Sequence, residues 1–178
     1  MSDFNEFEDY EIDKDFLSDK TKKKRKNSKD KGNRGELTLV KLLNTRFNTQ
    51  EFSRVVGSGN RWSHVAVVAK HYLGDICSPP NFKYLIECKF GYPQIDLCNT
   101  FDNGIPQLNE FLKQAEKDAG MAGKEPLVCW KKNHQPWLAV VKGLDRTFDY
   151  QLKYNDWVMV SLTKLLSLED DFFLLPQA

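Results

Sequence analysis

Residues 74–90 constrain the fold more than any other stretch of the chain, because they read as a β-hairpin with charged groups along one side. A short strand begins at Asp75, a turn follows at residues 78–81, and a second strand runs to residue 90. Side chains alternate along a strand, so Glu87 and Lys89 share one face. The opposite face is predicted to pack in the core and carries Tyr84, Ile86, Cys88 and Phe90. Since the hairpin returns Asp75 to the side of Glu87, two acids and a lysine are predicted to converge.

Converging carboxylates repel one another unless a cation lies between them, and all-oxygen ligand sets suit Mg²⁺ or Mn²⁺ better than zinc. A lysine beside them could orient a water molecule or offset charge on a transition-state oxygen. This combination is typical of metal-assisted phosphodiester hydrolysis. An ordinary salt-bridged strand with this face toward solvent would contain the same residues, so the pattern alone leaves both interpretations open.

The composition is that of an ordinary α/β protein. A chain of 178 residues can bury a core, and we expect one domain with charged tails. No apolar run approaches the roughly 20 residues that span a bilayer. The amino terminus is acidic and lacks an apolar segment, so we expect no export and a cytoplasmic location. The four cysteines form no C-x-x-C pair, which predicts buried thiols in a reducing compartment rather than a zinc or disulfide site.

The net charge of +1 hides a segregated amino-terminal segment. Residues 1–19 are acidic with interleaved aromatic residues, whereas residues 20–31 are basic. Because it lacks helical or strand periodicity, the segment 1–31 is predicted to be a disordered tail. Its basic block could contact phosphates, and its acidic block could dock a partner or shield the basic block. Alternatively, the whole tail could serve only solubility.

The other end of the chain, residues 169–178, is acidic and then apolar. Such a segment could pack back on the domain. It could also act as a short docking peptide for a replication, recombination or repair protein. Between the two tails, residues 32–168 are predicted to form the domain.

Apolar residues at helical spacing predict a first helix over residues 32–47, with Glu36 on its apolar side. A carboxylate there needs a partner unless it lies at the helix edge, where it would complement the helix dipole. The alternative is that Glu36 points over the sheet toward Asp75 and Glu87 as a third acid. A strand is predicted to follow over residues 51–57.

The second half of the domain is predicted to begin with a helix over residues 105–120, which contains Gln107 and Gln114. A second hairpin follows, with strands over residues 127–132 and 137–142. Three further elements complete the expected order: a mobile connection at 144–155, a strand at 156–160 and a short helix at 162–168.

Side chains suited to DNA phosphates occur near the first helix, in the glycine-rich loop after residue 57, and at the tip of the second hairpin. Glycines let a backbone approach a ligand closely, although the same loop could be a plain flexible turn and the lysines simple surface charge. The candidate DNA contacts are Arg34, Ser58, Asn60, Arg61, Lys131 and Lys132.

Six pieces of the chain occur in an order that resembles the PD-(D/E)XK nuclease superfamily, and most closely its Holliday-junction-resolvase-like branch from archaea and phages. The resemblance covers residues 32 to 143. No single piece is specific, but all six stand in the expected structural context. They are Glu36, Gly57-Ser58-Gly59, Gly74-Asp75-Ile76, Glu87-Cys88-Lys89, Gln114-Ala115 and Gly123-Lys124-Glu125-Pro126-Leu127-Val128.

The resemblance implies an α/β, restriction-endonuclease-like fold, with a roughly five-stranded mixed central sheet flanked by helices. It implies that Asp75 and Glu87 ligate Mg²⁺, for which Mn²⁺ would substitute, and that Lys89 positions the attacking water. Glu36 would complete the acid cluster, and Gln114 would support the site from the second helix. Two departures stand out: glycine precedes Asp75 where the motif has proline, and Gln107 is a rival to Gln114.

The expected function is therefore that of a Mg²⁺-dependent, structure-selective DNA endonuclease similar to Holliday junction resolvases. A homodimer would let two sites cut two strands of branched DNA. The expected setting is a phage protein that acts in the host cytoplasm. The same fold hosts other activities, so a restriction-like or recombination nuclease remains an alternative. A non-catalytic DNA-binding or interaction protein that uses the charged tail is the alternative from another class.

Overall fold

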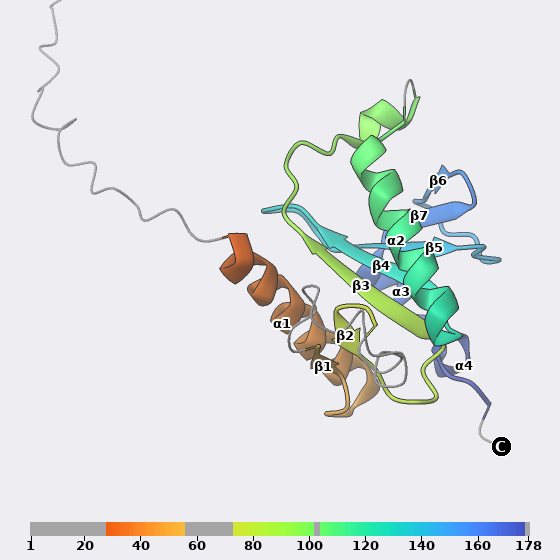
Figure 1. Cartoon of the computed structure of the whole chain (residues 1–178). Coiled ribbons are helices and arrows are strands. Elements are labelled where there is room, and N and C mark those ends of the chain that lie inside the picture. The colour runs from red at the N-terminus through yellow and green to blue at the C-terminus, as the bar shows by residue number, and fades with distance from the viewer. Residues whose placement is uncertain (1–27, 56–72, 102–103, 177–178) are drawn as a thin grey trace, which may run out of the picture.

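The computed structural model describes residues 28–55, 73–101 and 104–176 (Figure 1). The amino-terminal half contains α1 (Ser28–Phe47), β1 (Ser53–Arg54), β2 (Ile76–Cys77), β3 (Tyr84–Phe90) and the 3₁₀ helix η3 (Leu97–Phe101). The rest contains α2 (Pro106–Ala122), β4 (Glu125–Lys131), β5 (Leu138–Lys142), β6 (Leu152–Tyr154), β7 (Trp157–Ser161), α3 (Leu162–Leu165) and α4 (Asp170–Phe173). No helix within these ranges is long and apolar enough to cross a membrane.

The described strands form one mixed sheet in the order β1-β2-β3-β4-β5-β7-β6. β3 and β4 are parallel, and each of the other neighbouring pairs is antiparallel. Parallel neighbours need a long crossover connection, which here contains α2. The sheet has seven strands where about five were expected. β1 lies within the strand predicted over residues 51–57, whereas β6, which spans only three residues, was not predicted.

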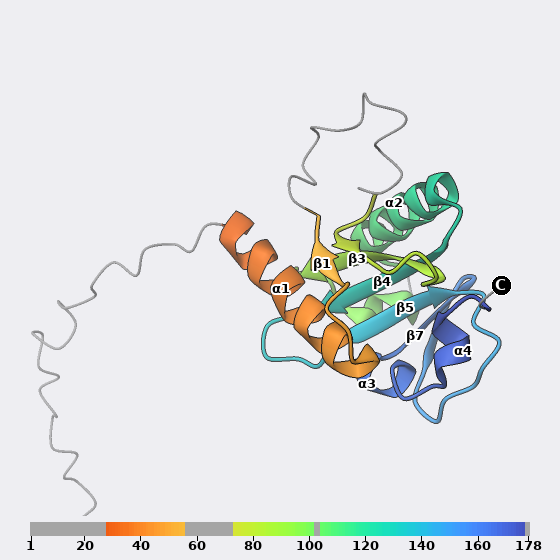
Figure 2. The ribbon, with the colours of Figure 1, turned by 90° about the horizontal axis from the view of Figure 1, so that it is seen from below.

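Helices cover both faces of the sheet, so the domain has three layers. α1, α3 and α4 pack on one face around a cluster that includes Leu39, Ile86, Leu165 and Phe173. α2 packs on the other face, where Leu108 and Phe111 meet Val128 and Trp130. Figure 2 shows α2 on one side of the sheet and the other three helices on the opposite side.

The predicted hairpin is confirmed. Ile76 of β2 pairs with Ile86 of β3 in an antiparallel register. Tyr84, Ile86 and Cys88 are buried against the α1 layer, as the alternation predicts. The face that carries Glu87 is also buried, because α2 covers it, and strands of a parallel pair are commonly covered on both faces. This burial excludes the solvent-facing strand that the pattern had left open.

The helices and the second hairpin also match their predicted positions, with two differences. α1 begins at Ser28, so the last residues of the expected tail are helical. The connection at 144–155, expected to be mobile, contains β6, which pairs with β7 through Lys153 and Val158. β6 is too short for periodicity to show it.

The carboxyl-terminal segment packs back on the domain through α4. Phe173 is fully buried, and its ring stacks on Phe82 with centroids 6.1 Å apart. In the segment before α4, the carbonyl oxygens of Leu166 and Leu168 accept hydrogen bonds from the Arg46 side chain of α1. Leu174 then forms a β-bridge with Phe82. Residues 170–174 are therefore part of the folded core layer.

Candidate active site

Gly74 sets the backbone that carries Asp75. Its φ is +77°, a conformation that favours glycine, and an added Cβ would lie 2.8 Å from the carbonyl oxygen of Ile86. Proline, whose φ is fixed near −65°, cannot adopt this conformation. This explains why glycine occurs where the family motif has proline.

Asp75 is held against β3 by both its backbone and its side chain. Its backbone N–H donates to the carbonyl oxygen of Ile86 at 3.0 Å. Its Oδ2 atom accepts from the backbone N–H of Cys88 at 2.9 Å. The carboxylate is therefore fixed beside the segment that carries Glu87 and Lys89.

Glu87 and Lys89 form a buried ion pair on the α2 side of β3. Lys89 Nζ lies 2.5 Å from Glu87 Oε1, and the two side chains are 12% and 3% exposed. Burial alone would lower the pKa of Lys89, but the charge and hydrogen bond of Glu87, together with the charge of Asp75, raise it overall. Lys89 is therefore a cation in this site.

The two neighbouring acids perturb Asp75. Burial of the carboxyl group, followed by repulsion from Glu87, raises the pKa of Asp75 to about 7. The hydrogen bond from Cys88 and the charge of Lys89 act in the opposite direction, and Glu36 adds a smaller upward contribution. The surroundings of Asp75 therefore favour the neutral form of its carboxyl group.

Glu36 reaches the same place from α1. Gly35 allows this approach, since an added Cβ there would lie 2.5 Å from Phe90 Cβ. The Glu36 side chain is only 13% exposed, and its Oε2 atom lies 2.5 Å from Arg54 Nε. Arg54 Nη2 also donates to Asn33 Oδ1 at 2.7 Å. The third predicted acid is therefore near Asp75 but paired with an arginine.

Sequence reasoning missed Arg54. Arg54 and its partner Glu36 lie on different elements, so no spacing pattern in the sequence connects them. One signal was available: a carboxylate on the apolar side of a helix requires a partner, and a cation was the natural candidate.

α2 brings Gln114, rather than Gln107, to the lysine. Lys89 Nζ donates to Gln114 Oε1 at 3.4 Å, while Gln107 is engaged with Gln94 at 2.6 Å. The Lys89 ammonium also lies 4.9 Å from the centre of the Phe111 ring. Among the described residues, Gln114 is the predicted glutamine with a contact in the site.

A cavity of about 390 Å³ opens beside these groups. Its lining includes Asp75 and Lys89 from the hairpin, Glu36 and Lys31 from α1, and Tyr92 after β3. Glu87 borders the site through its contacts with Lys89 and Asp75. Lys31, the last residue of the basic block, thus belongs to the folded domain and lies at the cavity wall.

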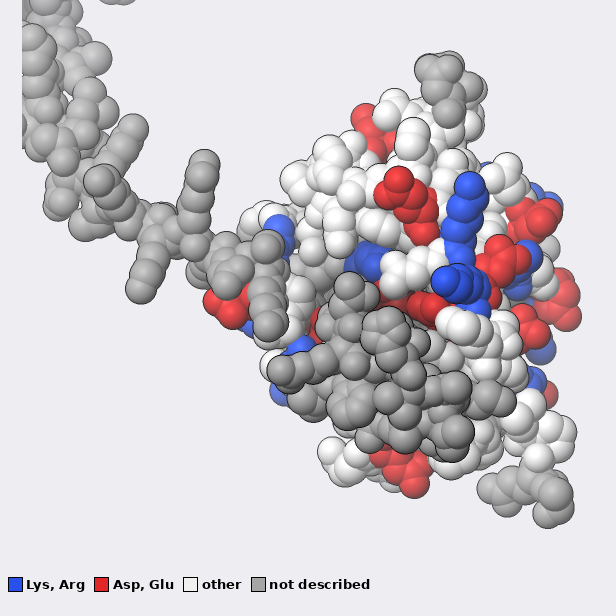
Figure 3. All heavy atoms as spheres, in the orientation of Figure 1, with Lys and Arg blue, Asp and Glu red and all other residues white. Residues whose placement is uncertain are grey.

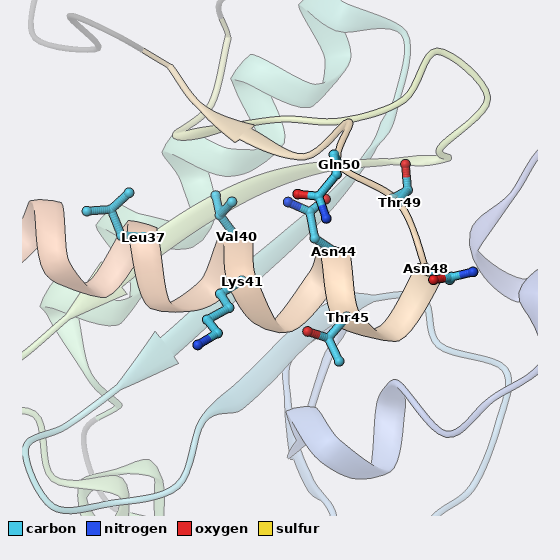
Figure 4. A pocket seen from close by; sticks show the side chains of 8 residues that line it. All are labelled: Leu37, Val40, Lys41, Asn44, Thr45, Asn48, Thr49 and Gln50. Atoms are coloured by element: carbon cyan, nitrogen blue, oxygen red, sulfur yellow. The ribbon is translucent and has the colours of Figure 1, made fainter.

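A larger cavity of about 930 Å³ lies along α1, between residues such as Leu37, Val40 and Asn44 and the turn at Thr49 and Gln50 (Figure 4). None of its described lining residues is acidic. It therefore lacks the groups that the hydrolytic chemistry requires, and the smaller cavity is the candidate site.

Asp75 and Glu87 offer oxygen donors of the kind that a hard divalent cation such as Mg²⁺ or Mn²⁺ takes. Within the described ranges, no cluster of three or more His, Cys, Asp or Glu side chains could enclose a metal ion. Mg²⁺ commonly keeps several waters and uses only one or two carboxylates together with substrate phosphates. Asp75 and Glu87, two oxygen donors close enough to repel, meet that description.

The predicted DNA contacts within the described residues each have another partner in the domain. Arg34 Nε donates to the carbonyl oxygen of Asp30, Lys132 Nζ donates to that of Ile95, and Lys131 lies over the Trp137 ring. On the face drawn in Figure 3, basic atoms alternate with acidic ones among the described residues. The remaining candidates lie outside the described residues: Ser58, Asn60 and Arg61.

A mixed sheet between helices, with Asp75 directly before one strand of a hairpin and Glu87-Cys88-Lys89 on the other strand, defines a restriction-endonuclease-like domain of the PD-(D/E)XK type. A model of the family described as "Phage putative PDDEXK endonuclease" matches residues 27–171, and the chain belongs to this family. The match confirms the resemblance to phage PD-(D/E)XK nucleases and does not distinguish the Holliday-junction branch. Searches of curated proteins and of solved structures gave no match.

Proposed function

We propose that this protein is a divalent-metal-dependent endonuclease that hydrolyses phosphodiester bonds in DNA. The observation that carries the proposal is that Asp75 and Lys89 line one cavity while Glu87 is paired with Lys89 beside it, in surroundings that raise the carboxyl pKa of Asp75 to about 7. A strongly perturbed acid beside a second acid and a lysine is the kind of arrangement found at catalytic sites.

Asp75 and Glu87 would hold Mg²⁺, or Mn²⁺ in its place. When bound, the ion would supply positive charge at the scissile phosphate and acidify a water molecule. The chain's own contribution is to hold the two carboxylates at fixed positions, through the Gly74 turn and the hydrogen bond from Cys88.

Lys89 would position the attacking water and offset negative charge that develops on the phosphate oxygens. Its ammonium is restrained by Glu87, Gln114 and Phe111, so it is preorganised at the cavity wall. Water attacks phosphorus in line with the 3′ oxygen. The bond to that oxygen breaks, the water proton passes to it, and a 5′ phosphate and a 3′ hydroxyl result.

Glu36 would complete the acid cluster from α1, with Arg54 fixing its carboxylate. Its pairing with Arg54 reduces the excess negative charge beside Asp75, which favours a site that accepts a phosphate as well as a cation. Lys31 would contact the DNA backbone at the same wall. Further backbone contacts would come from Arg34, Ser58, Asn60, Arg61, Lys131 and Lys132.

For the substrate, we propose branched DNA such as a four-way junction, cut by a homodimer. The support is the similarity in motif order to Holliday junction resolvases and the rule that a symmetric pair of sites can cut two strands. The protein would act in the host cytoplasm. Its amino-terminal tail would be the place where a replication or recombination protein docks, because the carboxyl-terminal segment packs on the domain.

The test is cleavage of a panel of four-way, flapped, single-stranded and linear duplex DNAs with Mg²⁺, with Mn²⁺ and with EDTA. We expect metal-dependent cutting with preference for the junction. Cutting of linear duplex at a fixed sequence would replace the junction proposal with the restriction-like alternative. Tight DNA binding without cutting, in either metal, would favour the non-catalytic interpretation.

Asp75→Asn and Lys89→Ala separate the enzyme from a DNA-binding protein. Both variants should lose cutting while junction binding largely survives, because the cavity rather than the wider DNA-contacting surface is altered. Undiminished cutting by either variant would remove that residue from the mechanism.

A further inference from the structure

Tyr92 follows β3 directly after Gly91 and lines the same cavity as Asp75 and Lys89. Its ring meets the Phe111 ring edge to face, with centroids 4.7 Å apart and an interplanar angle of 66°. The Lys89 ammonium lies 4.9 Å from the centre of that same Phe111 ring. Tyr92 and Lys89 therefore pack on one ring of α2, and both border the cavity.

The backbone of Tyr92 has an unusual conformation. Its φ is +55°, in the left-handed region that a residue with a bulky side chain rarely adopts. Two hydrogen bonds fix the turn: the N–H of Gly91 donates to the carbonyl oxygen of Lys131 at 2.8 Å, and the N–H of Ile95 donates to that of Tyr92 at 3.2 Å. Strained positions persist only where the surroundings hold them, and they cluster at functional sites. The turn thus presents a tyrosine where glycine would adopt the backbone more readily.

The Tyr92 hydroxyl is an unused hydrogen-bond donor. In the part of the chain that the structure describes, no group is hydrogen-bonded to it, although the side chain is partly buried. Tyrosine hydroxyls usually have a partner when they are buried. The described cavity wall otherwise carries two ammonium and two carboxyl groups, which belong to Lys31, Lys89, Glu36 and Asp75. Tyr92 adds a neutral donor to these charges.

A DNA phosphate in the cavity would bring charged non-bridging oxygens, which accept hydrogen bonds. Hydrogen bonds to charged oxygens are shorter and stronger than neutral ones. A phenol donates such a bond at a defined position without adding to the charge of the site. We infer that Tyr92 is a phosphate-binding residue, whose hydroxyl donates to a non-bridging oxygen of the phosphate that is cut. This role rests on the proposed function and deepens it, since the phosphate is that of the proposed cleavage.

The ring of Tyr92 could instead stack on an unpaired base of branched DNA, which would require an open ring face. The side chain is partly buried and packs on Phe111, so the structure favours the hydroxyl as the contacting group. Tyr92→Phe separates the two roles, because it keeps the ring and removes the hydroxyl. Tyr92→Leu removes both.

The kinetic experiment measures single-turnover cleavage of a four-way junction, junction affinity and stability in urea. Tyr92→Phe should cut about tenfold more slowly than wild type, the loss expected for one hydrogen bond to a charged oxygen. Its affinity should change little because other phosphate contacts remain, and its stability should be unchanged because the ring still packs on Phe111. Tyr150→Phe is the matched control: Tyr150 is 89% exposed, does not line the cavity, and should be replaceable at no cost in rate.

Wild-type cutting by Tyr92→Phe would overturn the inference. If Tyr92→Leu then cut slowly, the ring rather than the hydroxyl would be the contacting group.

Phosphorothioate substrates test which atom the hydroxyl contacts. Sulfur replaces each non-bridging oxygen of the cut phosphate in turn, and sulfur is a weak hydrogen-bond acceptor. With sulfur at the contacted position, wild type and Tyr92→Phe should cut at similar rates, because the bond is already lost. With sulfur at the other position, the tenfold difference should remain. The same difference with both isomers would mean that the hydroxyl and the phosphate act independently, which would overturn the inference.

A further readout does not depend on cleavage. Protein labelled with 3-fluorotyrosine contains six fluorinated rings, and the ¹⁹F signal of Tyr92 is identified by its absence in Tyr92→Phe. Junction DNA added with Ca²⁺, which also takes oxygen ligands, should shift this signal and leave that of Tyr150 in place. A Tyr92 signal that does not move at saturating DNA would overturn the inference. If wild type cuts no DNA with Mg²⁺ or Mn²⁺, the proposed function fails, while this spectrum still decides whether Tyr92 meets the DNA.

Discussion

Lys89 Nζ lies 2.5 Å from Glu87 Oε1 in a site that α2 shields from solvent, so this ion pair is both buried and part of the proposed catalytic group. Removing one member of a buried pair leaves the other charge uncompensated. The pair therefore links the stability of the domain to its activity.

Lys89→Met should abolish cleavage and also destabilise the protein. Methionine fills a similar volume beside Phe111 but leaves Glu87 buried without its cation. We expect a loss of about 3 kcal/mol in the free energy of unfolding, measured in urea with EDTA. The Glu87→Gln/Lys89→Met double variant should recover much of this loss. Lys113→Met, an exposed lysine on α2, serves as control and should change little. A double variant no more stable than Lys89→Met would contradict the pairing.

The raised pKa of Asp75 makes metal-free stability depend on pH. Its folded value of about 7 exceeds the reference value of 3.8, so the folded protein holds a proton that the unfolded chain releases. This contribution to stability is complete below pH 3.8 and is lost as the pH rises to about 7, by an amount on the order of 4 kcal/mol. Asp75→Asn should flatten that part of the urea-derived stability profile in EDTA. An equal slope in wild type and Asp75→Asn would show that Asp75 is not the group responsible.

Gly74 should tolerate no substitution. Gly74→Ala places Cβ against the Ile86 carbonyl oxygen at a positive φ, which should cost 2 kcal/mol or more, on the order of other strained backbone positions. Gly74→Pro, which would restore the family's residue, should be worse because φ cannot be reached. Thermal unfolding by circular dichroism measures both. Gly120→Ala in α2 is the control: its Cβ meets no atom within 4 Å, and alanine should stabilise the helix by about 0.5–1 kcal/mol.

Arg54→Ala should destabilise the domain by about 1–3 kcal/mol, because Glu36 then keeps a half-buried carboxylate without its charged hydrogen-bond donor. Glu36→Gln/Arg54→Ala should be more stable than Arg54→Ala alone, since the amide removes the uncompensated charge. Urea unfolding of wild type and the variants Glu36→Gln, Arg54→Ala and the double measures the coupling. A coupling free energy of zero would mean that the pair contributes nothing to the fold.

The cysteines should differ sharply in reactivity. Burial raises the pKa of Cys129 to about 12, and the pKa of Cys88 is also raised, chiefly by burial. Cys98 is exposed. Iodoacetamide at pH 8, followed by mass spectrometry, should label Cys98 and leave Cys88 and Cys129 unmodified until the protein is unfolded. Labelling of Cys129 as fast as Cys98 would contradict its burial.

Local patterns predicted much of the fold. Side-chain alternation identified β3 and its core face, and helical spacing located α1 and α2. These signals are local, because they depend only on the period of each element. β6 is too short to produce such a signal, and its pairing with β7 depends on the rest of the sheet. Of the strand predicted over residues 51–57, the described residues contain only β1.

Some residues of the candidate site could likewise be predicted from local patterns, and others could not. Asp75, Glu87 and Lys89 could be grouped from the hairpin alone, and Glu36 stood out as an acid on an apolar helix face. The choice between Gln107 and Gln114 could not be made, because both lie on α2 and only its docking brings Gln114 to Lys89. The role of Arg54 could not be predicted from a sequence pattern, because its pairing with Glu36 exists only once α1 packs against β1.

By itself, the sequence determined which acids and which lysine lie together on one hairpin, because strand alternation and turn chemistry act over a few residues. The tertiary structure alone decided the rest: that α2 buries Glu87, that Arg54 pairs with Glu36, and that Gln114 rather than Gln107 reaches Lys89. These contacts join residues on separate elements, and their energies depend on burial, which exists only once the layers have packed.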